Sequence, residues 1–400
     1  MEQPKHAGDT ISNRILYIVS LNHFINDGST YLISSLLTAM ILVFEFSEYE
    51  IGILVAVGYL VNLVFQPITG KYSEKLEARK LLALGISLIA ASMFLFIVAN
   101  GFAPMLVAML VLRLGSSFYH PVGVSAVSRA YSGAKLDSSM GFQSAFGNLG
   151  IVFAYVLAAP VYLAIGWKGP FLIYAALEVA TVVITLLGMK MPQVDSSVKQ
   201  DVVVQSKRKI SLGLPLFFVV SAFVTGGAFA IFGNFGNQLL FLHGFGIDLS
   251  DFMIATWMVS AFVGAIMVGR ITERISRLKL LALAYLLAGV SSVIFGLSGR
   301  DFAIALLGLL VNGFMLSMTY PIMYSELAAF LGDRSKGPAF GMLFSSNIGG
   351  ASILGFVGGY IGATLGLQVV FEISSIVLLC SILPALLWSR RRVRMNSRIS

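Results

Sequence analysis

Long apolar runs recur along this chain at nearly regular intervals, separated by short polar segments. A bilayer core of about 30 Å needs about 20 apolar residues to cross it, and twelve of the runs meet that length. We expect membrane-spanning helices at residues 15–44, 51–70, 81–99, 102–127, 140–165, 170–189, 214–242, 252–269, 280–297, 302–327, 338–362 and 367–388. Because backbone groups inside lipid must be paired within the chain, this pattern predicts an all-α integral membrane protein.

The composition agrees with a lipid environment. Charged residues make up 12% of the 400 residues, about half of the roughly 25% that is usual in soluble domains. So few charges could not cover the core of a soluble chain of this length. The single cysteine, Cys380, excludes an internal disulfide. No pair of histidines has metal-ligand spacing on a helix, so we expect no metal and no cofactor.

Basic residues mark one side of the membrane. All but three of the 27 lysines and arginines lie at the termini or in alternate loops, the exceptions being Lys168, Arg300 and the intramembrane Arg113. The positive-inside rule therefore places both termini in the cytoplasm and requires an even number of spans. The net charge of +8 is this topology signal, and it needs no nucleic-acid partner. We expect a monomeric multi-pass protein of the inner (cytoplasmic) membrane.

The two halves of the chain resemble each other at an offset of 199 or 200 residues. Segment 70–80 recurs as 269–279, and the pair His120-Pro121 matches Tyr320-Pro321. This predicts two pseudo-symmetric six-helix bundles, residues 1–190 and 212–400, joined by a polar cytoplasmic linker at 191–211. Six-span repeats of this kind build secondary transporters, whose solute site lies near the membrane midplane between the repeats.

A loop motif follows the second span. Gly70, Glu74, Lys75 and Arg79 occupy the positions Gly-x-x-x-Glu-Lys-x-x-x-Arg. The corresponding residues of the second copy are Gly269, Glu273 and Arg274. The glycine allows close helix approach, and the acid can pair with a basic group or a helix N-terminus in one conformation and release it in another. We expect these residues to form a conformational gate, the alternative being a basic loop that only sets topology.

The motif resembles the loop signature of the major facilitator superfamily, in which aspartate occupies the position of Glu74. The resemblance implies twelve membrane-spanning helices in two bundles and movement of a small solute by alternating access. The motif is common to the superfamily and does not identify the solute.

Charged side chains within the membrane are costly and indicate function. Asp27 lies about 20 Å beyond Arg14 at about 1.5 Å per residue, near the middle of the first span. His23 precedes Asp27 by one helical turn, and His120 follows Arg113 of the fourth span by seven residues. We expect an Asp27–Arg113 ion pair flanked by both histidines, with these four residues coupling proton movement to transport. The alternative is a structural pair that orients two helices and never titrates.

Amide and phenol groups in the spans can hydrogen-bond a solute or join helices. The candidate solute-binding residues are Asn26, Gln143, Asn148, Asn234, Asn237, Tyr320 and Asn347. At the repeat offset, the charged residues of the first half correspond to Phe223, Gly227, Gly313 and Tyr320. We therefore expect proton coupling in the first half and a more apolar solute wall in the second.

Four segments resemble the fosmidomycin-resistance branch of the superfamily: residues 23–27, 66–70, 115–121 and 141–150. This resemblance implies a proton-driven exporter of small amphipathic or anionic compounds, such as an antibiotic-resistance antiporter. Gly141 and Gly150 keep the spacing of the exporter signature, but Ala154 and Tyr155 stand where that signature has Gly-Pro.

Three functions therefore remain open. The first is proton-coupled efflux of a drug-like or metabolite solute, and the second is a symporter or uniporter that imports a small organic anion or nutrient. The third is a non-transporting membrane sensor or assembly factor. An enzyme is not expected, because the sequence has no phosphate-binding loop and no nucleophile–base pair at catalytic spacing.

Overall fold

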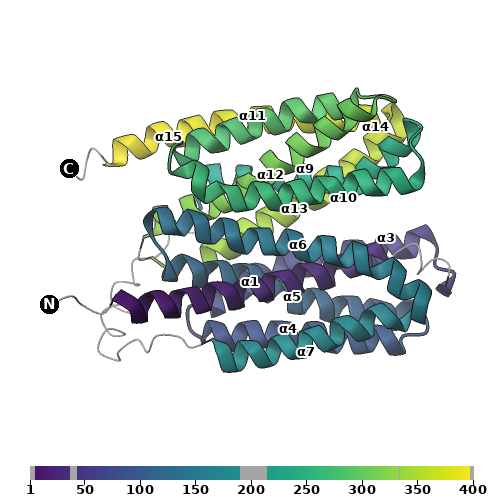
Figure 1. Ribbon diagram of the computed structural model, residues 1–400, viewed down its shortest axis with the longest axis horizontal. Coiled ribbons are helices and arrows are strands. Elements are labelled where there is room, and N and C mark those ends of the chain that lie inside the picture. Colours follow the sequence, from purple (N-terminus) through teal and green to yellow (C-terminus); the bar gives the residue numbers. More distant parts are fainter. Residues whose placement is uncertain (1–4, 37–42, 190–213, 333, 397–400) are drawn as a thin grey trace. The chain divides into compact units, whose positions relative to one another are not determined.

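The computed structural model describes residues 5–36, 43–189, 214–332 and 334–396 (Figure 1). Every regular element in these ranges is a helix. The helices are α1 (Lys5–Ser35), α3 (Glu48–Tyr72), α4 (Ala78–Val98), α5 (Phe102–Ala130), α6 (Gly133–Ile165), α7 (Lys168–Gly188), α9 (Leu216–Leu242), α10 (Ile247–Thr272), α11 (Arg277–Gly296), α12 (Phe302–Leu331), α13 (Gly337–Leu365), α14 (Leu367–Cys380) and α15 (Ile382–Asn396). The predicted all-α fold is confirmed.

The helices supply the twelve predicted spans. Ten spans within the described residues are long and apolar enough to cross a membrane, and α14 and α15 together make one of them. The other two predicted spans correspond to α1 and α3, helices of 31 and 25 residues. The sequence of α1 is less apolar because it carries Asn22, His23, Asn26 and Asp27.

The last span is interrupted at Ser381, between α14 and α15. Pro384 explains the break, because proline has no N–H and its ring clashes with the carbonyl four residues earlier, here Cys380. The span continues through α15 to the basic end of the chain.

By its internal contacts the chain divides into two compact units. Unit 1 comprises residues Met1–Ser132, Phe153–Leu216 and Leu327–Met342, and unit 2 comprises Gly133–Val152, Phe217–Glu326 and Leu343–Ser400. The predicted halves, 1–190 and 212–400, stay a prediction. The predicted linker, 191–211, lies entirely outside the described residues, which stop at 189 and resume at 214.

In unit 1, α4 packs against α5 and α7, and α5 also packs against α1 and α3. Gly85 and Gly115 lie where α4 crosses α5. A Cβ at Gly115 would lie 2.7 Å from the carbonyl oxygen of Gly85, so only glycine permits this approach. Small residues at a crossing bring helix backbones close enough for van der Waals packing to hold them together in lipid. Phe96 and Phe171 stack at 5.1 Å between α4 and α7.

In unit 2, α11 packs against α14 and α15. The buried amide of Asn312 joins three helices of this unit. Its Oδ1 accepts from Trp257 Nε1 at 3.1 Å, and its Nδ2 donates to the carbonyl of Ala288 at 3.1 Å. A satisfied buried amide fixes the rotation of α12 against α10 and α11.

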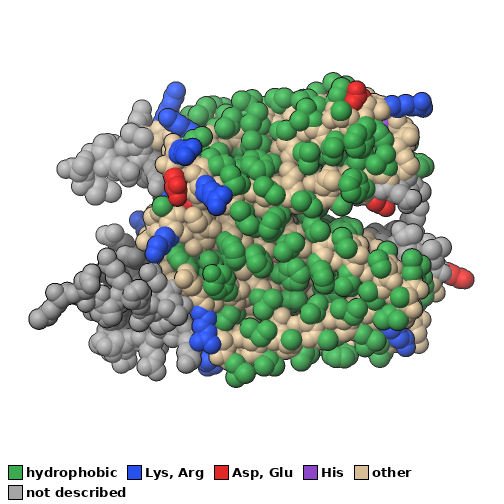
Figure 2. Space-filling view, in the orientation of Figure 1, with side chains coloured by type: hydrophobic (Ala, Val, Ile, Leu, Met, Phe, Trp, Pro, Cys, Tyr) green, Lys and Arg blue, Asp and Glu red, His purple; other side chains and the backbone are tan. Residues whose placement is uncertain are grey.

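Large apolar side chains are exposed along the helices of both units, including Leu163 and Phe356 at 80% exposure each. Figure 2 shows hydrophobic side chains over the flanks of the helices and basic side chains near helix ends. Apolar surface of this extent suits contact with lipid and not with water.

The Gly85–Gly115 crossing gives a stability prediction. Gly115→Ala should lower the unfolding temperature of the purified protein, because the new methyl group overpacks the α4–α5 contact at a cost of about 1–3 kcal/mol. Gly233→Ala is the matched control, since a Cβ there meets nothing within 4 Å. Equal unfolding temperatures for the two variants would contradict the packing argument.

Candidate functional site

Two faces of α1 carry polar side chains, and one of them faces α7. Asn22 and Ser29 are seven residues apart and lie on this face. Asn22 Nδ2 donates to Thr185 Oγ1 at 2.8 Å, and Ser29 Oγ lies 2.6 Å from Glu178 Oε1. These contacts set the rotation of α1. Its other polar face, which carries His23 and Asp27, therefore points to α5.

Ser29 places the carboxyl group of Glu178 against α1. Ser29 Oγ lies 2.7 Å from the carbonyl oxygen of Ile25 and donates to Glu178 Oε1 at 2.6 Å. Glu178 is fully buried. A carboxyl group at such a position inside the membrane is costly unless it is hydrogen-bonded, so this contact supports the packing of α1 on α7.

The other face of α1 meets α5 at a cluster of His23, Asp27 and His120. His23 Nε2 lies 3.1 Å from Asp27 Oδ2, and His120 Nε2 lies 3.6 Å from Asp27 Oδ1. Asn26 Nδ2 donates to Asp27 Oδ1 at 2.8 Å, so this predicted solute-binding amide supports the carboxylate. The side chains of Asp27 and His120 keep 17% and 23% of their surface exposed, against 7% for His23. The cluster is buried yet not sealed.

Tyr119 holds the histidine rings and was missed by the sequence analysis. Its ring stacks on His23 at 4.4 Å between centroids, and the rings of His23 and His120 meet edge to face at 5.3 Å. Tyr119 is almost fully buried. Its place next to His120 in the 115–121 segment was the available signal.

Pro121 shapes α5 next to the cluster. Proline removes the hydrogen bond to the carbonyl four residues earlier, which is that of Ser117. Thr69 Oγ1 of α3 donates to this carbonyl at 2.8 Å. The hydroxyl thus replaces the missing backbone donor and ties α3 to α5 three residues before His120.

The expected Asp27–Arg113 ion pair does not form. Within the described residues, no hydrogen bond or ion pair links Asp27 to Arg113, and the histidines hold the carboxylate instead. The side chain of Arg113 turns to α3, where its Cζ lies 5.6 Å from the ring centre of Tyr59. Helical spacing placed both residues near mid-span, but it could not show which neighbour each one faces.

Glu74 of the loop motif binds the start of α13 within unit 1. Its Oε1 accepts from Arg129 Nη2 at 2.6 Å and from the backbone N–H groups of Gly337 and Lys336 at 2.7 and 3.1 Å. Gly70 permits this approach, because a Cβ there would clash with the carbonyl of Gly337. A carboxylate at a helix N-terminus is stabilised by the free N–H groups and the helix dipole. We call this contact the Glu74 latch.

The basic residues of the motif play smaller parts in this state. Lys75 is exposed, and Arg79 Nη2 donates to Glu77 Oε2 at 3.1 Å. Hydrogen bonds from Lys80 and Arg79 hold the pKa of the Glu77 carboxyl below its usual value. Glu77, Arg79 and Lys80 lie at the start of α4, outside the membrane-spanning segment.

The second copy of the motif makes a different contact. Glu273 and Arg274 are exposed, and Gly269 lies against Ser138 of α6. Their predicted role as a gate stays a prediction.

Arg277 supplies an ion pair that the sequence analysis missed. Its Nε donates to Asp137 Oδ1 at 2.7 Å, and its Nη2 donates to the carbonyl of Gly133 at 3.3 Å. The repeat gave no signal for this pair, because Arg277 corresponds to Ala78 in the first copy.

Two of the predicted solute-binding residues come together in unit 2. Asn347 Nδ2 donates to the carbonyl of Ala222 at 3.1 Å and lies 3.4 Å from the hydroxyl of Tyr320. Asn148 Nδ2 donates to Ser317 Oγ at 2.8 Å, which joins α6 to α12. These amides therefore hold helices together in this state, and their contact with a solute stays a prediction.

The remaining three candidates lie apart. Gln143 is buried, and its Nε2 donates to Ser144 Oγ at 2.8 Å. Asn234 is exposed, and Asn237 donates to Asp251 near the start of α10. The structure does not gather them into one site.

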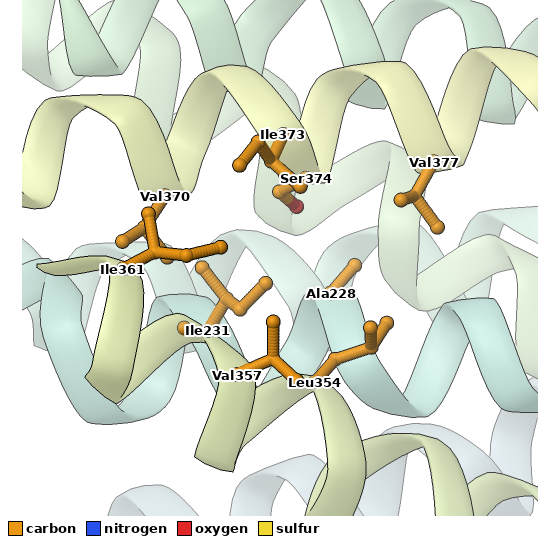
Figure 3. Close-up of a pocket in the computed structure, with 10 residues that line it drawn as sticks. Ala228, Ile231, Leu354, Val357, Ile361, Val370, Ile373, Ser374 and Val377 are labelled. Carbon is orange, nitrogen blue, oxygen red and sulfur yellow. The ribbon is translucent and has the colours of Figure 1, made fainter. Parts of the chain in front are cut away.

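Unit 2 also contains an apolar hollow between α9, α13 and α14 (Figure 3). The lining residues are Ala228, Ile231, Leu354, Val357, Gly358, Ile361, Val370, Ile373, Ser374 and Val377. Only Ser374 among them has a polar side chain, so the hollow offers dispersion contacts and no charge.

The cluster on α1 and α5 has the donor set of a cation site. One ligand atom from each of His23, Asp27 and His120 lies within 4.8 Å of the other two. Imidazoles and carboxylates bind transition metals, and they also bind protons. In this structure they contact one another directly, as proton-sharing groups do, and the expected absence of a metal stays a prediction.

The sequence profile of the Major Facilitator Superfamily matches residues 19–266 and 218–399, which together span nearly the whole chain. The chain belongs to this superfamily. It is therefore a multi-pass membrane transporter of a small solute, and not an enzyme.

Relatives within the superfamily include exporters. A probable sugar efflux transporter of Helicobacter pylori strain G27 is 23% identical over 372 residues, covering 89% of this chain and 93% of that protein. The fosmidomycin resistance protein of Escherichia coli strain K12 is 27% identical over 152 residues, covering 38% of this chain and 37% of that protein. The resemblance to the fosmidomycin-resistance branch is thus found over part of the chain.

Solved structures share the fold. The human organic anion transporter MFSD10 has a TM-score of 0.76 at 16% identity, covering 94% of this chain and 99% of its own. The Escherichia coli fucose:proton symporter FucP has a TM-score of 0.76 at 15% identity, covering 93% and 98%. At these identities the likeness shows the major facilitator fold alone.

The bond from Thr69 to Ser117 yields a prediction for α5. Thr69→Val should destabilise the protein by about 1–3 kcal/mol, because the buried carbonyl beside Pro121 loses its donor. Thermal unfolding of the purified protein measures this, with Thr69→Ser as the matched control that keeps the hydroxyl. If both variants unfold at the same temperature, the donor does not matter.

The bond from Ser29 to Glu178 yields a second prediction. Glu178→Gln should unfold at nearly the wild-type temperature, because the amide oxygen can accept the hydrogen bond from Ser29. Glu178→Ala should be less stable by about 1–3 kcal/mol, since it loses the buried hydrogen bond. A glutamine variant as unstable as the alanine variant would contradict the hydrogen-bond argument.

Proposed function

We propose that this protein exports a small organic solute across the cytoplasmic membrane in exchange for protons, by alternating access. The observation that carries the proposal is the buried His23–Asp27–His120 cluster on two membrane-spanning helices. Ionisable groups at such depth are costly, and they mark ion and proton pathways in transporters.

The cluster is suited to reversible binding of a proton. Its carboxylate is held by two imidazoles and an amide, with no lysine or arginine bonded to it among the described residues. Histidine exchanges protons near neutral pH, and a carboxylate beside it shares the proton through a hydrogen bond. The side chains of Asp27 and His120 are 17% and 23% exposed, and this exposed surface is the proposed route by which protons reach the cluster.

The Glu74 latch is the proposed partner of this proton site in the conformational cycle. It joins α3 and α5 to the start of α13 through charge-assisted hydrogen bonds. Alternating access requires such contacts to exist in one state and open in the other. Because the latch lies at the basic ends of these helices, the positive-inside rule assigns it to the cytoplasmic side.

The proposed outward direction of transport is supported by relatives such as the probable sugar efflux transporter and the fosmidomycin resistance protein. The solute is small and organic, and the protein acts as a monomer with both termini in the cytoplasm.

A second candidate is a proton symporter that imports an organic anion. The observation that favours it is Arg113, a buried cation with no carboxylate bonded to it among the described residues. Such a cation attracts a negatively charged solute whichever way the solute moves.

Asp27 gives the test of proton coupling. In proteoliposomes with an imposed pH gradient, Asp27→Asn should reduce gradient-driven solute movement to the level of protein-free vesicles, because the amide cannot take up the proton. Exchange of labelled for unlabelled solute, which needs no net proton movement, should survive. The panel of solutes comprises organic anions, sugars and amphipathic drugs.

Asp301→Asn is the matched control, since Asp301 is exposed and its oxygen accepts from the backbone of Ile304. It should behave as the wild type. Equal gradient-driven movement by wild type and Asp27→Asn would remove Asp27 from the proton pathway.

A further inference from the structure

Three metal-ligand side chains meet where α1 packs against α5 (Figure 1). His23 and Asp27 lie one turn apart on α1 and share a face of that helix, and His120 comes from α5. One ligand atom from each residue lies within 4.8 Å of the other two. Histidine spacing along a single helix gives no signal for a donor set that two helices share.

The separations within this cluster fit a tetrahedral ion. Ligand atoms bound at about 2.0–2.2 Å around a tetrahedral centre lie about 3.3–3.6 Å apart. His23 Nε2 lies 3.1 Å from Asp27 Oδ2, and His120 Nε2 lies 3.6 Å from Asp27 Oδ1. Since no pair of ligand atoms is more than 4.8 Å apart, side-chain movements of about 1.5 Å or less can close them on one ion.

Neighbouring side chains hold the ligands in place. The ring of Tyr119 stacks on His23 at 4.4 Å between centroids, and Asn26 Nδ2 donates to Asp27 Oδ1 at 2.8 Å. A hydrogen bond of this kind orients a ligating carboxylate. Asp27 and His120 keep part of their surface exposed, so protein does not enclose the cluster on all sides.

We propose that His23, Asp27 and His120 bind a divalent transition metal ion of the Zn²⁺ type. Two imidazoles and one carboxylate suit Zn²⁺, Co²⁺ and Ni²⁺, whereas Mg²⁺ and Ca²⁺ prefer sites made of oxygen atoms. Three protein ligands leave one position of a tetrahedral ion for water.

The charges around the cluster favour an ion that exchanges with solution. Asp27 is the one anionic ligand of the three, and Arg113 on α5 acts on it electrostatically and repels a second cation. Glu178 of α7 is bonded to Ser29, on the other polar face of α1. The bound ion is therefore a reversible ligand and not a permanent structural metal.

Metal and proton exclude each other at this cluster. The contact of 3.1 Å between His23 Nε2 and Asp27 Oδ2 holds a hydrogen, which must leave before one ion can bind both atoms. If the cluster carries the transported proton, a bound metal stops gradient-driven movement of the solute. This consequence rests on the proposed function, whereas the metal site itself does not.

The test titrates Co²⁺ into protein purified without a polyhistidine tag, because Co²⁺ takes the ligands of Zn²⁺ and absorbs visible light when bound. We expect absorption bands that saturate at one ion per chain and disappear when Zn²⁺ is added. Asp27→Asn and His120→Gln should each weaken Co²⁺ binding at least about 10-fold, since each removes one of the three protein ligands.

His243→Gln is the matched control, because His243 follows α9 and lies beside Ser298, away from α1 and α5. It should bind Co²⁺ as the wild type does. Metal-free unfolding temperatures show which variants are folded. Equal binding by the wild type and folded Asp27→Asn or His120→Gln, or loss of binding in His243→Gln, would overturn the proposal.

X-ray absorption by Zn²⁺ bound to the wild type needs no variant, so it decides the question even if both ligand variants unfold. We expect two imidazoles and at least one oxygen atom around each ion. A sulfur ligand would assign the ion to Cys380, and fewer than two imidazoles would exclude the cluster. Either result overturns the proposal, as does a folded wild type that binds neither Co²⁺ nor Zn²⁺.

Failure of the metal site is distinguishable from failure of the proposed function. If Asp27→Asn loses proton coupling but binds Co²⁺ as tightly as the wild type does, transport stands and the metal site falls. If Co²⁺ binding depends on Asp27 and His120 but a pH gradient never drives solute movement, the metal site stands and proton coupling falls.

Discussion

Inside a bilayer, a carboxylate has to find its hydrogen-bond donors within the protein, and Asp27 finds them on two helices. His23 and Asn26 come from its own helix, and His120 comes from α5. The rotation of α1 must satisfy two sets of contacts at once. Asp27 has to reach His120 of α5, and Asn22 and Ser29 have to reach α7. The two polar faces of α1 therefore support each other: the α7 contacts keep the proton cluster aimed at α5.

The site depends equally on α5, which carries Arg113, Tyr119 and His120. Gly115 brings this helix against α4, and Pro121 breaks its hydrogen-bond ladder beside the histidine. The broken ladder remains satisfied because Thr69 of α3 donates to the freed carbonyl. Local weakness in α5 is thus offset by its neighbours, as expected where a helix must be deformable without exposing polar backbone to lipid.

Hydropathy and charge predicted the twelve spans, because lipid tolerates so few alternatives. Helical spacing also predicted that His23 and Asp27 share a face. It could not predict that Asp27 meets His120 and not Arg113, since that depends on the register between α1 and α5. The ion pair of Arg277 with Asp137 was hidden for a related reason, because it has no counterpart in the first half. Contacts between helices far apart in sequence leave no periodic signal in either one.

The proton cluster and the Glu74 latch share α5, which carries His120 of the cluster and Arg129 of the latch. Pro121 lies between these two residues and interrupts the backbone hydrogen bonds of the helix. A ligand shifts a conformational equilibrium only by the difference between its affinities for the two states. Exchange of a solute for protons therefore requires the solute and the proton to bind most tightly in different conformations, and the opening of the Glu74 latch is what could separate those conformations.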